Sequence, residues 1–146
     1  MINMNSKGQS FAVFKLLIGA IVALAILTII VGVIDYFDNI KIQISEKQMI
    51  DSIVSAANAP NQLVKAEKLS FSKGSSYSKK VFAQTINIEE ECIILGSDGS
   101  AFNDLGNAIL IENNVQADVF FRCEENAQPV TCPLECTVSF GKSIPN

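Results

Sequence analysis

Four cysteines are the residues of this chain with the most recognisable chemistry, and all lie in its C-terminal part: Cys92, Cys123, Cys132 and Cys136. An even number of cysteines in a small domain outside the cytoplasm is typical of two disulfides. Cys123 and Cys136 bracket the segment between the last two predicted strands, so they can face each other, which would leave Cys92 with Cys132. Four cysteines allow three connectivities, and the sequence does not choose among them.

A zinc site is the alternative, because the thiolates of Cys132 and Cys136, with three residues between them, could both act as ligands. A second close cysteine pair is missing, and outer compartments favour oxidation. The sequence also contains no Cys-x-x-Cys motif, which disfavours a redox role. We therefore expect disulfides, no metal site and no cofactor.

Other reactive groups are sparse. The chain has no histidine, which excludes catalytic and metal-binding schemes built on imidazole. The acidic run 89–91, or Asp98 with Asp104, could bind a cation, but a charge run is usually a solvated face and the calcium-loop spacing is absent. Residues 97–100 are a turn signal rather than a nucleophile, because no base accompanies them. We expect no catalytic residues.

The charge balance argues against a nucleic-acid partner. From Ala59 onward the chain has seven basic and eleven acidic residues, a net charge of −4. Proteins that bind nucleic acids need lysine and arginine clustered along one face.

The elements that would position these groups begin with an apolar segment, residues 11–34, which is 24 residues long and contains one charge, Lys15. A helix of about 20 residues crosses the hydrocarbon core of a bilayer, which is about 30 Å thick. The segment is too long for the apolar region of a secretory signal, and Asp35 follows it instead of a small-residue cleavage site. We therefore predict a retained transmembrane helix, with membrane lipid as its surroundings.

Charges on either side of this helix predict its orientation. Lys7 and Lys15 lie on its N-terminal side, and Asp35 and Asp38 follow it. Basic residues favour the cytoplasm, so we expect a single-pass protein of the cell membrane with a cytoplasmic N-terminus and an extracellular C-terminal domain. Lys15 would lie about one turn inside the boundary, where its long side chain can reach the headgroups.

The residues Lys7-Gly8-Gln9-Ser10-Phe11 resemble the archaeal class III signal sequence of type IV pilin-like proteins. This resemblance implies that a prepilin-type peptidase cuts between Gly8 and Gln9, so that residues 1–8 are a leader and the apolar helix is kept as the stem. It also implies an archaeal source. The alternative is that these residues are only the polar flank of a signal anchor.

One position departs from the pattern of that family. Pilins that polymerise generally have a glutamate at the fifth position after the cut, where it pairs with the N-terminus of a neighbouring subunit. Counting Gln9 as the first residue, this position is Val13. The departure puts filament assembly in doubt and favours a minor subunit or a membrane protein that does not polymerise.

Small residues within the transmembrane segment suggest a second property. Gly19 and Ala23 are four residues apart, and this spacing lets transmembrane helices approach closely. The face could contact copies of the same chain or other membrane helices. Glycine and alanine are common in membrane helices anyway, so the pattern has an ordinary explanation too.

Residues 35–58 predict an amphipathic stem helix that follows the transmembrane helix of residues 9–34. Its apolar residues recur mainly at steps of three and four, which predicts one buried stripe: Phe37, Ile40, Ile44, Ile50, Ile53, Val54 and Ala57. Ile42 and Ile44 also fit a short strand, so a kink near Ile40 is the alternative. The helix should end before Pro60.

Residues 59–146 predict a small extracellular domain stabilised by disulfides. We expect strands near 69–71, 92–95 and 137–140, a short helix over 78–85 with Ser78 as N-cap, and a hairpin of 108–112 with 115–121. Asn113 and Asn114 tolerate the left-handed conformation of such a turn. The predicted fold class is α+β: a long N-terminal helix packed on a small, mostly antiparallel sheet, as in pilins.

Three functions remain to be compared. The first is a membrane-anchored, pilin-like surface protein with a structural or adhesive role, processed by a prepilin-type peptidase and able to form homo-oligomers. The second is an accessory subunit or binding module with a single span that never polymerises, which Val13 favours. The third, an enzyme with an outer active site, is disfavoured because catalytic groups are missing.

Overall fold

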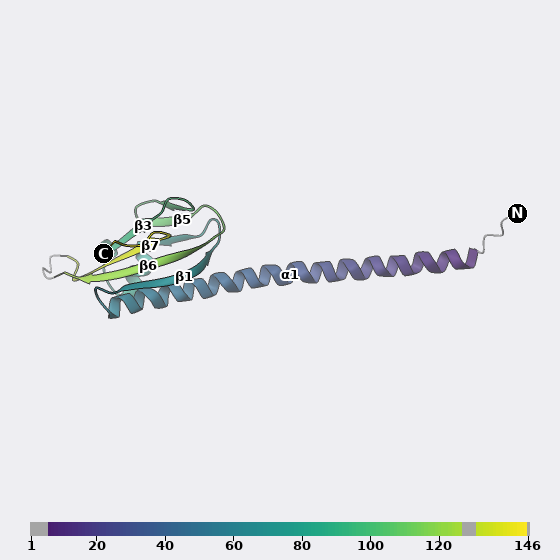
Figure 1. Cartoon of the computed structure of the whole chain (residues 1–146), viewed down its shortest axis with the longest axis horizontal. Coiled ribbons are helices and arrows are strands. Elements are labelled where there is room, and N and C mark those ends of the chain that lie inside the picture. Colours follow the sequence, from purple (N-terminus) through teal and green to yellow (C-terminus); the bar gives the residue numbers. More distant parts are fainter. Residues whose placement is uncertain (1–5, 127–130, 146) are drawn as a thin grey trace. The chain divides into compact units, whose positions relative to one another are not determined.

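The computed structural model describes residues 6–126 and 131–145 and divides the chain into two compact units, Met1–Asn39 and Ile40–Asn146. The described part of the first unit is helical throughout, whereas the second, which we call the head, combines helices with two sheets (Figure 1). The last part of the predicted stem therefore belongs to the head. The α+β class predicted from the sequence is confirmed.

The helix α1, Ser6–Asn58, includes both the apolar segment and the stem. It is one uninterrupted helix through Ile40, so Ile42 and Ile44 are helical and the alternative of a short strand is wrong. It ends where predicted, just before Pro60, and Asn61 follows with a positive φ of 66°. Because a residue preceding proline is displaced from the helical region, Ala59 cannot continue the helix easily.

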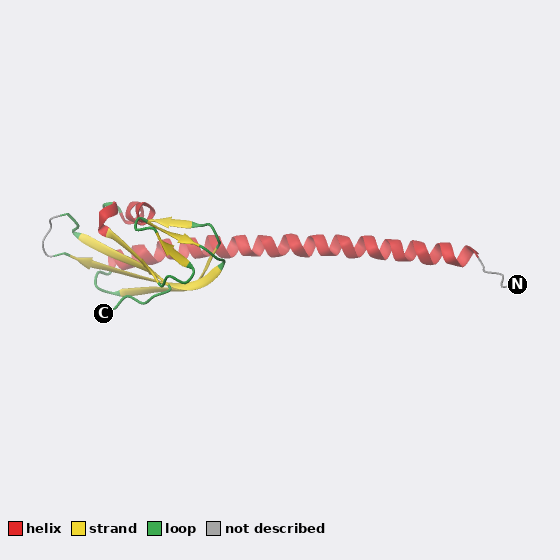
Figure 2. Cartoon of the chain, turned by 90° about the horizontal axis from the view of Figure 1, so that it is seen from above, coloured by secondary structure: helices red, strands yellow, loops and turns green. Residues whose placement is uncertain are grey.

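Seven strands form two sheets in the head (Figure 2). The larger sheet has the order β1-β6-β7-β3, made of Leu63–Phe71, Val115–Glu125, Leu134–Phe140 and Ile93–Ser97. The smaller sheet has the order β2-β5-β4, made of Ser76–Ser78, Ala108–Ile111 and Phe102–Asp104. Only the β3–β7 pairing is parallel among these described strands.

The predicted hairpin of 108–112 with 115–121 is wrong. The first of these strands, β5, pairs with β2 and β4, whereas β6 pairs with β1 and β7. A strand has only two edges, and both edges of β6 are occupied. The turn between β5 and β6 instead forms hydrogen bonds with the loop after β1. The backbone N–H of Lys73 donates to Asn114 Oδ1 (2.8 Å), and that of Gly74 donates to the Ile111 carbonyl (2.8 Å).

Two short helices complete the head. The helix α2, Lys79–Ile86, confirms the predicted helix within one residue, but the Ser78 side chain makes no capping hydrogen bond because Ser78 ends β2. The 3₁₀ helix η1, Glu90–Cys92, precedes β3. Cys92, predicted to begin a strand of residues 92–95, therefore belongs to η1, and β3 begins at Ile93. Ile94 is 43% exposed, so only one face of β3 is buried.

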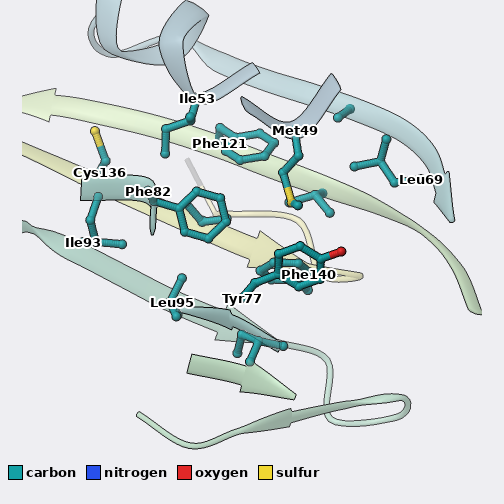
Figure 3. Packing of buried hydrophobic residues seen from close by; sticks show 14 of the residues in the cluster. Met49, Ile53, Leu69, Tyr77, Phe82, Ile93, Leu95, Phe121, Cys136 and Phe140 are labelled. Atoms are coloured by element: carbon teal, nitrogen blue, oxygen red, sulfur yellow. The ribbon is translucent and has the colours of Figure 1, made fainter. Parts of the chain in front are cut away.

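The core lies between the C-terminal part of α1, the larger sheet and α2. Met49 and Ile53 point from α1 toward Phe121 on β6 (Figure 3), and all three are almost completely buried. Phe82 of α2 is buried in the same cluster. A second group of buried rings links the two sheets with centroid distances of 5.5–5.9 Å: Phe71, Tyr77, Phe102 and Phe140.

The buried stripe predicted for the stem is wrong in most of its members. Ile44, Ile50 and Val54 are exposed by 59%, 40% and 37%, whereas the residues that face the sheet are Ser45, Met49, Ile53 and Ala56. Ser45 explains the difference, because its hydroxyl accepts the backbone N–H of Ser70 on β1 (2.8 Å) and donates to the Lys41 carbonyl (2.8 Å). The helix thus supplies a hydrogen-bond acceptor to one backbone N–H on the open edge of β1.

Candidate functional site

The apolar part of α1 is the strongest candidate for a functional element. Among the described residues α1 is the one helix long and apolar enough to cross a membrane, judged by length and composition. Every residue from 11 to 34 is exposed in the described structure. An apolar surface of this kind requires lipid or another apolar partner.

Gly19 and Ala23, predicted to pack against another helix, lie on this open surface. A methyl group added at Gly19 would meet no atom within 4 Å, and the same holds for Gly32. Ala23 is exposed as well. The described structure therefore leaves room for a second helix on this side and contains none.

Polar and aromatic residues mark the two ends of the apolar segment. Lys15 Nζ lies 4.8 Å from the centre of the Phe11 ring, one helical turn earlier. At the other end, the rings of Tyr36 and Phe37 meet edge to face at 6.2 Å, next to Asp35. Aromatic rings are typical of the interfacial layers of a membrane.

The predicted cleavage site lies at the start of α1. Gly8 and Gln9 follow Ser6, the first residue of the helix, and thus belong to its first turn. Residues 1–5 of the predicted leader lie outside the described residues. The predicted cut between Gly8 and Gln9 remains a prediction.

The structure contains two disulfides, Cys92–Cys132 and Cys123–Cys136, and no free cysteine. Cys123 and Cys136 are opposite each other on the antiparallel strands β6 and β7, as their positions on either side of the connecting loop suggested. The bond between Cys92 and Cys132 joins the end of η1 to the same loop. The zinc alternative would need free thiolates, which these pairings remove.

Asp118, which the sequence did not single out, forms hydrogen bonds at the irregular pairing between β1 and β6. Two residues of β1, Glu67 and Lys68, face the single residue Asp118 of β6, which is a β-bulge, and Lys68 has a φ of 53°. Asp118 Oδ1 accepts the backbone N–H of Lys68 (2.9 Å), and its Oδ2 lies 2.9 Å from Lys65 Nζ. The Lys68 N–H, followed by Lys65, lowers the pKa of Asp118 below its ordinary value. A long-range contact of this kind leaves no local signal in the sequence.

The acidic residues considered as cation ligands lie in ordinary structural positions. Asp98 accepts the backbone N–H and the hydroxyl of Ser100 (3.0 Å each), and Asp104 accepts the N–H of Gly106 (2.7 Å), so both close turns. The acidic run 89–91 lines an open hollow of about 580 Å³ together with Lys79, Cys92 and Thr131. Within the described residues no group of three His, Cys, Asp or Glu side chains could hold a metal ion.

Tyr77 is a second residue without a sequence signal. Its ring is packed against Phe71 and Phe140 in the core, and its hydroxyl is buried without a hydrogen-bond partner in the described structure. Burial, and then the charge of Glu46 on α1, raises the pKa of Tyr77 to about 12. The phenol is therefore neutral at physiological pH and acts as a packing group.

Comparison with known proteins yields no match to a family model, to a curated protein or to a solved structure.

Proposed function

We propose that this chain is a single-pass membrane protein of pilin-like architecture, whose apolar helix carries a disulfide-bonded head outside the cell in a structural or adhesive role. One observation carries the proposal: residues 11–34 form a helix in which every residue is exposed. At about 1.5 Å per residue this helix is long enough to cross the roughly 30 Å hydrocarbon core. Lipid is the surrounding that such a surface requires.

The orientation is supported by charge and by the cysteines. Lys7 and Lys15 precede the span, and basic residues near the end of a span favour the cytoplasmic side. All four cysteines of the head are paired, and structural disulfides persist mainly in oxidising compartments. Both features favour a cytoplasmic N-terminus and an outer head.

The likeness to pilins is supported by the leader-like residues before the helix and by a second apolar face on the stem. Ile50 and Val54, four residues apart, are exposed on a side of α1 that is turned by about 100° from Met49 and Ile53, because each follows one of them by a single residue. Ile44, nearer the N-terminus, is exposed as well. Such a face suits contact with helices of other copies or of another membrane protein. The further partner implied by the leader is a prepilin-type peptidase.

The N-terminal peptide of the protein in native cell envelopes tests the leader. Mass spectrometry should find Gln9 as the first residue. Gly8→Val should keep residues 1–8, because the family's peptidase cuts after glycine, whereas the matched control Ser6→Ala should be cut normally. Intact residues 1–8 on the unmodified native protein would overturn the assignment of the leader.

The orientation is tested separately in intact cells. After treatment with a membrane-impermeant reductant, an impermeant maleimide should label the cysteines of the head. A cysteine introduced by Ser10→Cys should react only after the membrane is permeabilised, and it serves as the internal control. Labelling of the head that also requires permeabilisation would contradict the proposed orientation.

A second candidate function is an accessory subunit that does not polymerise. The observation that favours it is Val13, which replaces the glutamate found in pilins that form filaments. Surface filaments purified from native cells distinguish the two functions. The presence of this chain as a stoichiometric component of such filaments would eliminate the accessory subunit, and its recovery only from membranes would support it.

A further inference from the structure

We propose that Lys15 binds a lipid phosphate and thereby sets the depth of α1 in the membrane, so that the hydrocarbon core is crossed by residues 16–34. The inference rests on the proposed membrane anchor. It adds the group that Lys15 binds and the position of the helix along the membrane normal. It places Phe11 and Phe14 in the interfacial layer rather than among the acyl chains.

The spacing of charges along the helix is the first argument. Lys15 and Asp35 are 20 positions apart, and no charged residue lies between them. At about 1.5 Å per residue this interval measures roughly 30 Å, the thickness of the hydrocarbon core. Both charges can therefore lie at its boundaries at the same time, without either being buried in lipid.

The aromatic residues give an independent argument, because they lie just outside the same two charges. Phe11 and Phe14 are 62% and 58% exposed and precede Lys15, whereas Tyr36 and Phe37 are 64% and 55% exposed and follow Asp35. Rings at both ends place the interval between Lys15 and Asp35 in the hydrocarbon and the rings in the headgroup layers.

The ligand follows from the charges available at that depth. Asp35 is the first acidic residue of the chain, so copies packed side by side in register would bring Lys15 next to other lysines and to no carboxylate. Lysine binds phosphate as a compact point charge with three donors, and phosphates form a layer just outside the hydrocarbon. Phe11, with its ring centre 4.8 Å from Nζ, lies beside the same ammonium group.

The register has a consequence for processing. The bond between Gly8 and Gln9 lies between six and seven residues before Lys15, so at about 1.5 Å per residue it is held roughly 10 Å outside the hydrocarbon. A peptidase with its active site at the membrane surface can reach a bond at this height.

Tryptophan depth measurements test the proposal, and the chain is suited to them because it contains no tryptophan. The full chain carrying Phe14→Trp, Leu24→Trp or Phe37→Trp is placed in phosphatidylcholine vesicles with bromine either near the headgroups or near the ends of the acyl chains. We expect bromine near the headgroups to quench the first and third reporters more strongly, and bromine near the chain ends to quench the second.

Lys15→Leu should then let the helix slide, because the uncharged segment would extend over residues 11–34. Its midpoint would move by between two and three residues, which corresponds to roughly 4 Å. The reporter at position 14 should move deeper and the one at position 37 should move outward, while Lys15→Arg keeps both in place. Movement in opposite directions identifies sliding, because misfolding would not produce it.

Each remaining outcome contradicts a distinct statement. Reporters at 14 and 37 that stay in place in Lys15→Leu, or move equally in Lys15→Arg, would overturn the role of Lys15 in setting the depth. In vesicles of a galactolipid without phosphate, the reporters at 14 and 37 should shift in the same directions as in Lys15→Leu but by less, because the Lys15 ammonium still resists burial in hydrocarbon. An unchanged depth there would overturn phosphate as the ligand. A reporter at position 24 that no lipid bromine quenches would overturn the membrane anchor itself.

Discussion

Asp118 shows that a single half-buried side chain can fix the backbone conformation of a neighbouring strand. Its carboxylate holds the backbone of Lys68 and the side chain of Lys65 at the point where β1 departs from regular pairing. The bulge changes the side-chain phase of β1, so that Ala66, Leu69 and Phe71 all face the core. The residue therefore determines which side chains of an edge strand are buried.

We expect Asp118→Asn to lower the Tm of the detergent-solubilised protein at neutral pH. An amide has no negative charge, so it interacts more weakly with the Lys65 ammonium and the Lys68 N–H than the carboxylate does. The lowered pKa of Asp118 means that its stabilisation is complete above the ordinary aspartate pKa of about 4 and is lost as the pH falls through the lower folded-state value. Thermal unfolding followed by near-UV circular dichroism should therefore show a larger difference in Tm between this variant and the unmodified protein at pH 7 than at pH 2.

Glu112→Gln is the matched control for this variant, since Glu112 is an exposed carboxylate directly after β5. Its Tm should equal that of the unmodified protein at both pH values. A difference between Asp118→Asn and the unmodified protein that persists undiminished at pH 2 would show that the charge of Asp118 is not what stabilises the bulge.

At the scale of elements, the stem part of α1 has two different apolar faces. One face packs on the sheet through Met49, Ile53 and Ala56, and the other exposes Ile44 and Val54. Ile53 is 0% exposed and belongs to the first face, whereas the next residue, Val54, is 37% exposed and belongs to the second.

These two positions give a paired mutational test. Ile53→Ala should lower the free energy of unfolding by about 2–5 kcal/mol, because it leaves a cavity in the core. Val54→Ala should change it by no more than about 0.5 kcal/mol, because that side chain is already in contact with solvent. Denaturant unfolding of the head in the full chain measures both. Equal losses for the two variants would contradict the placement of the buried face.

The two disulfides join different elements and differ in exposure. Cys123 and Cys136 are 0% exposed on β6 and β7, whereas Cys132 is half-buried on the loop that it joins to η1. A mild reductant should therefore open Cys92–Cys132 first, because thiol–disulfide exchange requires access to a sulfur atom. Alkylation at successive times followed by peptide mass spectrometry gives the order. Simultaneous opening of both bonds would show that global unfolding, not local access, controls reduction.

At the scale of the whole molecule, the division between the units falls inside α1 and not at its end. The head begins at Ile40 and includes the stem residues that cover its core. The domain predicted from sequence, residues 59–146, lacks this helix and would expose Leu69 and Phe121, which are both 0% exposed in the complete head.

We expect a fragment of residues 40–146 to be a soluble monomer with both disulfides. A fragment of residues 59–146 should aggregate or fail to form them, because the sheet loses the helix that buries its inner face and satisfies Ser70 at the edge of β1. Size-exclusion chromatography and thiol titration of the two fragments test this. A well-folded shorter fragment would show that the stem helix is dispensable for the head.

The sequence by itself determined the apolar span, the helix that follows it and the pairing of the cysteines in disulfides. These features depend on length, hydropathy and spacing along the chain, which are local quantities. The end of α1 before Pro60 and the short helix near 78–85 were predictable for the same reason.

Only the tertiary structure decided which face of the stem is buried, which strands are neighbours and where the bulge lies. Ser45, and not the predicted Ile44, faces the sheet, because its hydroxyl accepts the backbone N–H of Ser70, 25 residues away. Lys68 adopts its left-handed conformation because Asp118, 50 residues away, accepts its N–H. Contacts between such distant residues follow from the packing of the complete head, and periodicity within one segment does not record them.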